Sequence, residues 1–300
     1  MTTAYVFPGQ GSQFVGMGRE LARLRPVVKG FFQRADAALG FSLSTLCFEG
    51  PESELNDTLN TQPAIFAHSL AAFAAVEMSG EVEAPSFVAG HSLGEVSALC
   101  AAGALTFEDG IRLARERGRL MKLAGERQPG SMAAVIGLDT EILRAVCAEA
   151  SQAHPPGVVV ANDNCPGQVV ISGDKEAVAA ASAAAKSRGA RRVVPLAVSI
   201  AAHSPLMASI TEEFAQVVAG APLQPARIPI VANTSAQPIT HPDDIRAELC
   251  AQLTAPVRWT ESVQWMRAQN VTSFVEIGPK DVLVNLIKRI AGDVETRAIG

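Results

Sequence analysis

Short apolar runs alternate with longer helix-like segments in the first hundred residues. Residues 4–7 and 86–90 are strand-like, and a glycine-rich loop at 8–13 follows the first of them. Helical spacing of apolar residues follows the second strand, over residues 95–104. Because strands that alternate with helices form parallel sheets covered by helices, this part of the chain predicts an α/β domain.

The order of the elements changes near residue 130. A turn cluster at 162–167 separates two short strands, and the whole segment reads strand, helix, strand, strand, helix, strand. These six elements are expected at residues 132–138, 139–151, 158–161, 168–172, 175–186 and 191–198. The β-α-β-β-α-β order is that of the ferredoxin-like motif, so a second subdomain is predicted here.

The α/β alternation then resumes. The expected elements are a strand at 228–232, helices at 242–253 and 257–269, a strand at 273–276 and a helix at 281–291. The fold class is therefore α/β, with a parallel-sheet domain interrupted by a ferredoxin-like subdomain. The large domain is expected to comprise residues 1–127 and 198–300, and the inserted subdomain residues 128–197.

Composition narrows the class of protein. The chain has 300 residues, of which 48% are hydrophobic and 18% charged, and this is ordinary for a globular protein with a large core. A net charge of −5 argues against nucleic acid as the main partner. The longest apolar stretch, near residues 64–76, is too short to span a bilayer, so no membrane association is expected.

The cysteines and the amino terminus indicate a cytoplasmic location. Five cysteines are scattered along the chain and none has C-x-x-C spacing, which predicts neither a disulfide framework nor a zinc site. This usage fits a reducing compartment. The chain runs from Met1 directly into a strand-like segment, with no charged region followed by an apolar one, so no signal peptide is expected.

The most informative motif is Gly90-His91-Ser92-Leu93-Gly94. It lies between a strand and a helix, the context in which G-x-S-x-G forms a nucleophile elbow. Glycines allow the tight turn, and the Leu93 N–H together with the helix dipole could stabilise an oxyanion beside Ser92. The alternative is a simple strand-to-helix turn that contains a serine.

A catalytic serine needs a base, and histidine is the usual one. His91 adjoins the serine, but neighbours on such a turn point apart, and His68 lies in an apolar helical run. His154 and His241 lie in loops with proline. His203 remains, among small residues that leave space for a substrate. A purely structural role for it stays open. Since no Asp or Glu stands out as a third member, a backbone carbonyl could orient the imidazole.

The loop at 8–13 offers a second oxyanion donor. Its sequence is Pro-Gly-Gln-Gly-Ser-Gln, and glycines let a backbone approach a bound group closely. The N–H of Gln10 could therefore complete an oxyanion hole with that of Leu93. A phosphate loop is the rival interpretation, but neither of the usual glycine-rich phosphate motifs is present.

Arg117 is the basic residue that the helical pattern singles out. Over residues 111–124, the other basic residues share one polar stripe, whereas Arg117 lies nearly opposite, on the apolar face with Met121. A buried guanidinium must find an anion, because leaving it unpaired costs several kcal/mol. The anion could be an internal Asp or Glu, or a substrate carboxylate held by a bidentate pair.

Several motifs occur together, in order, along almost the whole chain. They are Phe7-Pro8-Gly9-Gln10-Gly11-Ser12-Gln13, Thr61-Gln62-Pro63-Ala64, Gly90-His91-Ser92-Leu93-Gly94-Glu95, Arg117-Gly118, Met132-Ala133-Ala134-Val135, Val169-Val170-Ile171-Ser172-Gly173 and Pro256-Val257-Arg258-Trp259. In these motifs the chain resembles the malonyl-CoA:acyl-carrier-protein transacylase family of fatty-acid and polyketide synthesis. The resemblance implies a hydrolase-like α/β domain with an inserted ferredoxin-like subdomain.

The resemblance also implies ping-pong chemistry. Ser92 would attack the malonyl thioester with His203 as base, coenzyme A would leave, and the phosphopantetheine thiol of an acyl carrier protein would take the acyl group. Gln10 and Leu93 would supply oxyanion N–H groups, and Arg117 would pair with the malonyl carboxylate. The site is completed by residues expected to line the substrate pocket or to orient the histidine. His91, Met121 and Ala202 are expected to line the pocket. Gln252 lies near the position at which a backbone carbonyl orients the histidine in this family.

Some points stay open at this stage. Ala202 stands where the family usually has Ser or Phe, so methylmalonyl selectivity is an alternative to malonyl. A serine hydrolase or editing thioesterase on the same scaffold is another alternative. No cofactor or metal is expected besides malonyl-CoA and the phosphopantetheinyl carrier protein, and a monomer is expected. Two basic groups are candidates for docking an acidic carrier protein, namely Arg188, Arg191 and Arg192, and separately Lys288 and Arg289.

Overall fold

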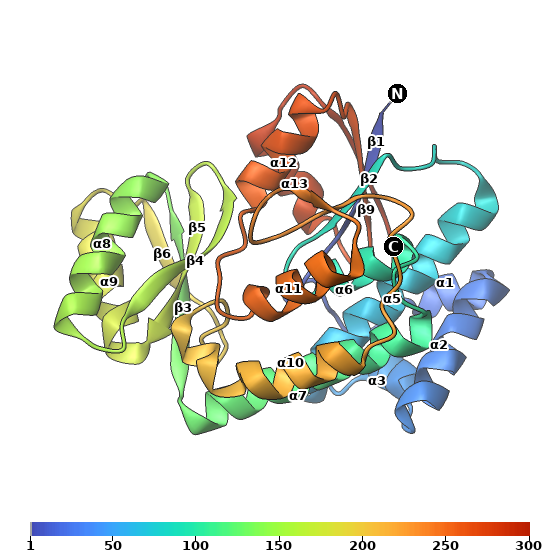
Figure 1. The fold of residues 1–300 in the computed structure, drawn as a ribbon, viewed down its shortest axis with the longest axis horizontal. Coiled ribbons are helices and arrows are strands. Elements are labelled where there is room, and N and C mark those ends of the chain that lie inside the picture. Colours follow the sequence, from blue (N-terminus) through green and yellow to red (C-terminus); the bar gives the residue numbers. More distant parts are fainter. Residues whose placement is uncertain (1) are drawn as a thin grey trace.

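The chain forms two β-sheets flanked by helices in the computed structural model, which describes residues 2–300 (Figure 1). The strands are β1 (Thr3–Phe7), β2 (Phe87–Gly90), β3 (Gly130–Ile136), β4 (Val158–Cys165), β5 (Gln168–Asp174), β6 (Arg192–Pro195), β7 (Ile230–Val231), β8 (Pro238–Ile239), β9 (Ser273–Ile277) and β10 (Glu295–Ile299). The amino-terminal helices are α1 (Arg19–Leu24), α2 (Pro26–Leu39), α3 (Leu43–Glu49), α4 (Glu52–Leu55), α5 (Thr58–Ser79), α6 (Gly94–Ala101) and α7 (Phe107–Arg127). The remaining helices are α8 (Thr140–Ala153), α9 (Lys175–Ser187), the 3-10 helix η1 (Pro205–Ile210), α10 (Thr211–Gly220), α11 (Pro242–Gln252), α12 (Trp259–Ala268) and α13 (Val282–Ile290).

The larger sheet has the order β10-β9-β1-β2-β7-β8. All neighbouring strands are parallel except β7 and β8. Phe7 at the end of β1 is paired with Gly90 at the end of β2. The loop at 8–13 and the Ser92 turn therefore leave the same edge of the sheet side by side, where open α/β sheets bind their ligands.

The two faces of this sheet bury two separate cores. Successive side chains of a strand point to opposite faces, and β1 is buried throughout. Tyr5 and Phe7 pack in the larger core with residues of α2, α5 and α7. Ala4 and Val6 pack in a second core with residues of α12 and α13. A strand that is apolar at every position is thus explained by helices on both faces.

The smaller sheet has the order β4-β5-β3-β6, with all neighbours antiparallel. This is the strand order of the ferredoxin-like motif, and the predicted fold class is confirmed. Ala133 and Val135 of β3 pack under α8 and α9, at the left of Figure 1. Met132 and Ala134, which alternate with them, face a cavity beside the larger sheet. The domain boundaries drawn at residues 127 and 198 stay a prediction.

The pattern of apolar residues missed parts of the larger sheet. The strand expected at 228–232 is only two residues long as β7, and β8 and β10 were not expected. β10 is an edge strand that carries Glu295 and Arg297 and is largely exposed, so it lacks the apolar alternation that reveals a strand.

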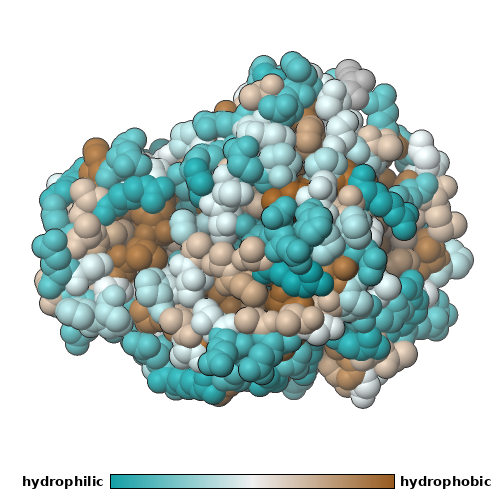
Figure 2. Space-filling model, viewed as in Figure 1, coloured by the Kyte–Doolittle hydropathy of each residue, from teal (hydrophilic) through white to brown (hydrophobic). Residues whose placement is uncertain are grey.

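The surface of the molecule is mixed. Hydrophilic residues cover most of the rim of the face in Figure 2, and apolar residues come to the surface in its middle and toward the smaller sheet. Within residues 2–300, no helix combines the length and apolarity needed to cross a membrane.

Candidate active site

The Ser92 turn has the strained geometry of a nucleophile elbow. Ser92 has a φ of 53°, in the left-handed region that non-glycine residues rarely adopt. The chain folds back so tightly that a Cβ on Gly90 would lie 1.9 Å from the carbonyl carbon of Gly94. A Cβ on Gly94 would lie 2.0 Å from the carbonyl oxygen of Phe7. Both glycines of the motif are therefore required by close contact.

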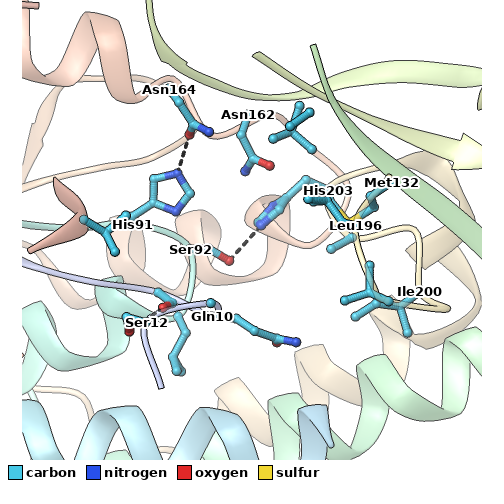
Figure 3. A pocket seen from close by; sticks show the side chains of 18 of the residues that line it. Gln10, Ser12, His91, Ser92, Met132, Asn162, Asn164, Leu196, Ile200 and His203 are labelled. Carbon is cyan, nitrogen blue, oxygen red and sulfur yellow. Dashed lines mark hydrogen bonds between the residues drawn. The ribbon is translucent and has the colours of Figure 1, made fainter. Parts of the chain in front are cut away.

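Ser92 and His203 form a hydrogen-bonded pair across 111 positions of sequence. The Ser92 Oγ lies 2.8 Å from His203 Nε2 (Figure 3). On the other side of the ring, Nδ1 lies 2.8 Å from the main-chain oxygen of Gln252. Because a carbonyl oxygen only accepts, Nδ1 carries the proton, and Nε2 is left to accept from the serine hydroxyl. This is the tautomer that a general base requires.

The environment keeps this imidazole neutral. His203 is 2% exposed, and burial together with the positive charge of Arg117 lowers its pKa to about 3. The Gln252 carbonyl acts in the opposite direction but more weakly. A neutral ring at pH 7 has its Nε2 lone pair available for a proton.

Two backbone N–H groups stand free beside the serine. Within residues 2–300, neither the N–H of Gln10 nor that of Leu93 donates to another protein group. The loop that carries Gln10 is held tightly against the elbow, since a Cβ on Gly9 would lie 2.4 Å from the main-chain oxygen of His91. The serine's own N–H is occupied, because it donates to Asn233 Oδ1 at 2.8 Å.

Arg117 is buried with no carboxylate in direct contact. It is 1% exposed, and its guanidinium donates to Gln62 Oε1 at 2.9 Å and to Gln252 Oε1 at 2.6 Å. A third bond runs to Ser92 Oγ at 3.2 Å. No Asp or Glu of residues 2–300 forms an ion pair with it, so the internal salt bridge is absent from the described structure. Burial lowers its pKa to about 10, and the group stays charged at pH 7.

A cavity of about 350 Å³ opens above these residues. It is lined by His91, Met121 and Ala202, as well as by the serine, the histidine and the arginine. His91 Nε2 lies 2.8 Å from Asn164 Oδ1, on the polar side of the cavity, while Ala202 belongs to the apolar side. Figure 3 separates the two sides, with Asn164 beside His91, and with Met132, Leu196 and Ile200 beyond Ser92 and His203.

The candidate docking residues lie apart from the reacting groups. Arg188 is bonded to Glu149 on the outer side of the insert. Arg289 of α13 lies nearer the cavity, because it donates at 2.5 Å to Gln168, a lining residue. The docking role of both groups stays a prediction.

Sequence reasoning missed several polar residues that hold the site. Asn233 accepts from the serine N–H, Gln62 binds Arg117, and Glu95 bonds to both Asn233 and Gln252. One available signal was Gln62 itself, a polar residue directly before the mainly apolar stretch 63–76 of helix α5. Such a residue requires a partner when it is buried. Asn233 carries no comparable local signal.

Comparison with known proteins identifies the family of this chain. The family model for the acyl transferase domain matches residues 4–298. The malonyl CoA-acyl carrier protein transacylase of Bacillus subtilis (strain 168) is 44% identical over 296 residues, which cover 99% of this chain and 92% of the relative. That of Escherichia coli (strain K12) is also 44% identical over 296 residues, covering 99% and 95%.

Solved structures give the same result. A malonyl-transacylase in complex with its type II PKS acyl-carrier protein superposes with a TM-score of 0.96 at 44% identity, covering 99% of this chain and 96% of that one. An acyl carrier protein S-malonyltransferase from Vibrio cholerae gives a TM-score of 0.95 at 42% identity, with coverage of 100% and 97%. This chain is an acyltransferase and belongs to the malonyl CoA-acyl carrier protein transacylase family of acyl transferase domains.

Proposed function

We propose that this enzyme transfers a malonyl group from malonyl-CoA to the phosphopantetheine thiol of an acyl carrier protein through an acyl-enzyme on Ser92. The observation that carries the proposal is Arg117. Its charge is buried among neutral acceptors and lies 3.2 Å from the Ser92 hydroxyl. No carboxylate of residues 2–300 bonds directly to this guanidinium, although Glu95 is near enough to interact with its charge. An acyl group with a terminal carboxylate would supply the missing direct partner in a bidentate pair.

In the first half-reaction, Ser92 Oγ attacks the thioester carbonyl while His203 Nε2 takes the hydroxyl proton. The N–H groups of Gln10 and Leu93 are directed at the oxyanion of the tetrahedral intermediate. The C–S bond then breaks, and the proton on His203 passes to the departing coenzyme A sulfur. The Gln252 carbonyl stabilises the transient imidazolium through its bond to Nδ1.

The second half-reaction repeats these steps with a different nucleophile. His203 takes the proton of the carrier-protein thiol, the sulfur attacks the Ser92 ester, and the C–O bond breaks as the serine regains its proton. No further cofactor or metal is part of the proposed reaction. We place the enzyme in the cytoplasm as a monomer that supplies malonyl units for fatty-acid or polyketide synthesis.

A broader donor range is a second candidate. Ala202 lies on the apolar side of the cavity with Met132, Val170 and Ile200, and its small side chain leaves room for a methyl group on the acyl chain. Methylmalonyl-CoA would then also be a donor. The relatives named above are transacylases, so a hydrolase or editing thioesterase is not favoured.

The test is a donor panel read by mass spectrometry. The enzyme is incubated with malonyl-, methylmalonyl-, acetyl- or succinyl-CoA, first alone and then with holo carrier protein. Malonyl should appear on Ser92 and move to the carrier protein faster than it is lost to water. Hydrolysis that outpaces transfer, or equal use of acetyl-CoA, would contradict the proposal.

A further inference from the structure

Glu95 is a buried carboxylate just behind the catalytic serine. It lies in the first turn of α6 and is 1% exposed, so water does not satisfy its oxygens. Asn233 donates twice to Oε1, from its main-chain N–H at 2.9 Å and from Nδ2 at 3.0 Å. Gln252 Nε2 donates to Oε2. A carboxylate in this position costs desolvation energy, which makes a purely incidental role expensive.

The first of these partners fixes the backbone of the nucleophile. Asn233 Oδ1 accepts from the Ser92 N–H at 2.8 Å, and its Nδ2 also donates to the main-chain oxygen of Gly90 at 2.6 Å. One side chain therefore bonds to both ends of the strained turn. Glu95 determines which way that amide points, because it binds the nitrogen and leaves the oxygen for Ser92.

The second partner connects three functional groups. Gln252 Nε2 donates to the main-chain oxygen of Ser92 at 3.1 Å, and its Oε1 accepts from Arg117 Nη2 at 2.6 Å. Its own main-chain oxygen orients His203. A rotation of this side chain or a shift of its backbone would disturb the serine, the arginine and the histidine together.

The polarity of the hydrogen bonds determines the state of Glu95. A guanidinium only donates, so Gln252 must present its oxygen to Arg117 and its nitrogen to Glu95. Glu95 then accepts three N–H bonds. A protonated Glu95 would need an acceptor for its O–H, and none of these partners offers one. Burial and the nearby Glu248 raise the pKa of Glu95 above its usual value, and the donated bonds and Arg117 only partly offset this. Three donors with no acceptor facing them favour the ionised form.

We propose that Glu95 is a positioning residue, an ionised acceptor that orients the Asn233 and Gln252 amides and through them holds Ser92, His203 and Arg117 in register. It touches neither substrate nor the reacting atoms. The inference rests on the proposed role of Ser92 as nucleophile, and it concerns how that nucleophile is held rather than which acyl group it takes.

E95Q is the most direct variant. The shape is kept, and one oxygen can still accept from Asn233, but the new amide nitrogen would face the nitrogen of Gln252. Gln252 must then turn its own nitrogen toward Arg117, which also only donates. A displacement of about 1 Å in a reacting group costs about 10²-fold in rate. We expect a loss of this size in the rate of Ser92 acylation.

Two acyl donors separate this inference from the proposed function. Malonyl-CoA requires Arg117, whereas 4-nitrophenyl acetate has no carboxylate and reports only on Ser92 and His203. E95Q should be slower with both. E248Q is the matched control, since Glu248 is also buried but bonds to Thr234, and it should stay within about twofold of wild type.

Combining E95Q with Q252E reverses the polarity of the bond between these two side chains and restores the match to position 95 and to Arg117. It does not restore the bond to the Ser92 main-chain oxygen, which the turned Gln252 amide of E95Q has already lost. The amide nitrogen introduced at position 95 then donates to the carboxylate introduced at position 252, which still accepts from Arg117. This double variant should recover at least about tenfold over E95Q with the nitrophenyl ester, but not with malonyl-CoA, because Arg117 is neutralised. If E95Q fails to fold, the rate of a folded double variant with the nitrophenyl ester tests the positioning role on its own.

The outcomes are distinct. Wild-type rates in E95Q, or a folded double variant without recovery on the nitrophenyl ester, would overturn the positioning role and leave the proposed function intact. A wild-type enzyme that forms no acyl-enzyme with either donor would overturn both. Loss in E95Q, wild-type rates in E248Q and recovery in the double variant would support the proposal.

Discussion

The two walls of the cavity are built by different means. The wall from the larger sheet carries Ser92, His203 and Arg117, each held by hydrogen bonds between segments far apart in sequence. The wall from the smaller sheet carries polar side chains near His91, namely Asn162, Asn164 and Gln168, and elsewhere presents apolar side chains of β3 and β5, such as Met132 and Val170. The first wall is defined by bond directions and the second mainly by shape.

This difference bears on how each wall tolerates change. Attack on a thioester needs atoms within about 3–3.5 Å and aligned, so small displacements in the hydrogen-bonded wall are costly. An apolar wall distinguishes acyl groups by volume, and one methyl group is worth only about 1–3 kcal/mol there. Substitutions in the first wall should therefore cause the larger losses of malonyl transfer, and those in the second should mainly change the preference between acyl groups of different size.

The largest effect is expected for Ser92→Ala. Removing the nucleophile should lower malonyl transfer by at least about 10⁴-fold, because the acyl-enzyme cannot form. Intact-protein mass after incubation with malonyl-CoA should show no adduct in the variant. A malonyl adduct of unchanged yield would mean that another residue is the nucleophile. The hydrogen-bonded wall would then not be the reacting one.

Arg117→Ala tests the electrostatic part of the same wall. Malonyl transfer should weaken by about 2–5 kcal/mol, while transfer of acetyl should change much less, since only malonyl loses a buried ion pair. Arg119→Ala on the exposed side of the same helix is the control, and its kcat/KM should stay at the wild-type value. Equal losses for both donors in Arg117→Ala would argue against carboxylate recognition.

The buried histidine should also leave a signature in stability. Folded His203 has a pKa of about 3 against an ordinary value of 6.5, so the unfolded chain binds more protons between these pH values. Its contribution to stability is present above pH 6.5 and is lost as the pH falls. The loss amounts to about 2 kcal/mol between about pH 6.5 and pH 5.

Urea unfolding at several pH values measures this contribution. His203→Gln should flatten the acid side of the curve by that amount. Wild type measured over the same pH values is the reference. An unchanged slope in His203→Gln would mean that the folded protein protonates this ring as readily as the unfolded chain.

The smallest effect concerns the apolar side. Ala202→Phe should narrow the cavity and raise the ratio of malonyl to methylmalonyl kcat/KM by about tenfold. Ala208 lies on the exposed side of η1 and provides a matched control, Ala208→Phe, with an unchanged ratio. A ratio that falls in Ala202→Phe would show that this position does not limit the size of the acyl group.

Local patterns in the sequence were enough to predict much of the fold. The elbow glycines, the apolar β1 and the six elements of the insert are all properties of neighbouring residues. The edge strand β10 was missed because its polar, exposed residues have no apolar alternation. Strand pairing at an edge depends on backbone bonds to a distant partner, and side-chain pattern does not record these bonds.

For the site, too, local patterns point to some residues, and long-range bonds hide others. Arg117 was found through helical phase and His203 by elimination. Asn233 and Glu95 were not found, because their importance lies in bonds across 141 and 138 positions, to Ser92 and between each other. Gln252 entered only through family resemblance, since a main-chain oxygen leaves no trace in residue type.

We propose that the wall with Ser92, His203 and Arg117 selects an acyl group by the carboxylate at the end of that group. Brief mixing of the enzyme with equal amounts of malonyl-CoA and acetyl-CoA, followed by acid quench and mass analysis of the Ser92 peptide, tests it directly. Malonyl is expected on Ser92 in large excess over acetyl. Acetyl in equal or greater amount, or malonyl on another residue, would contradict it.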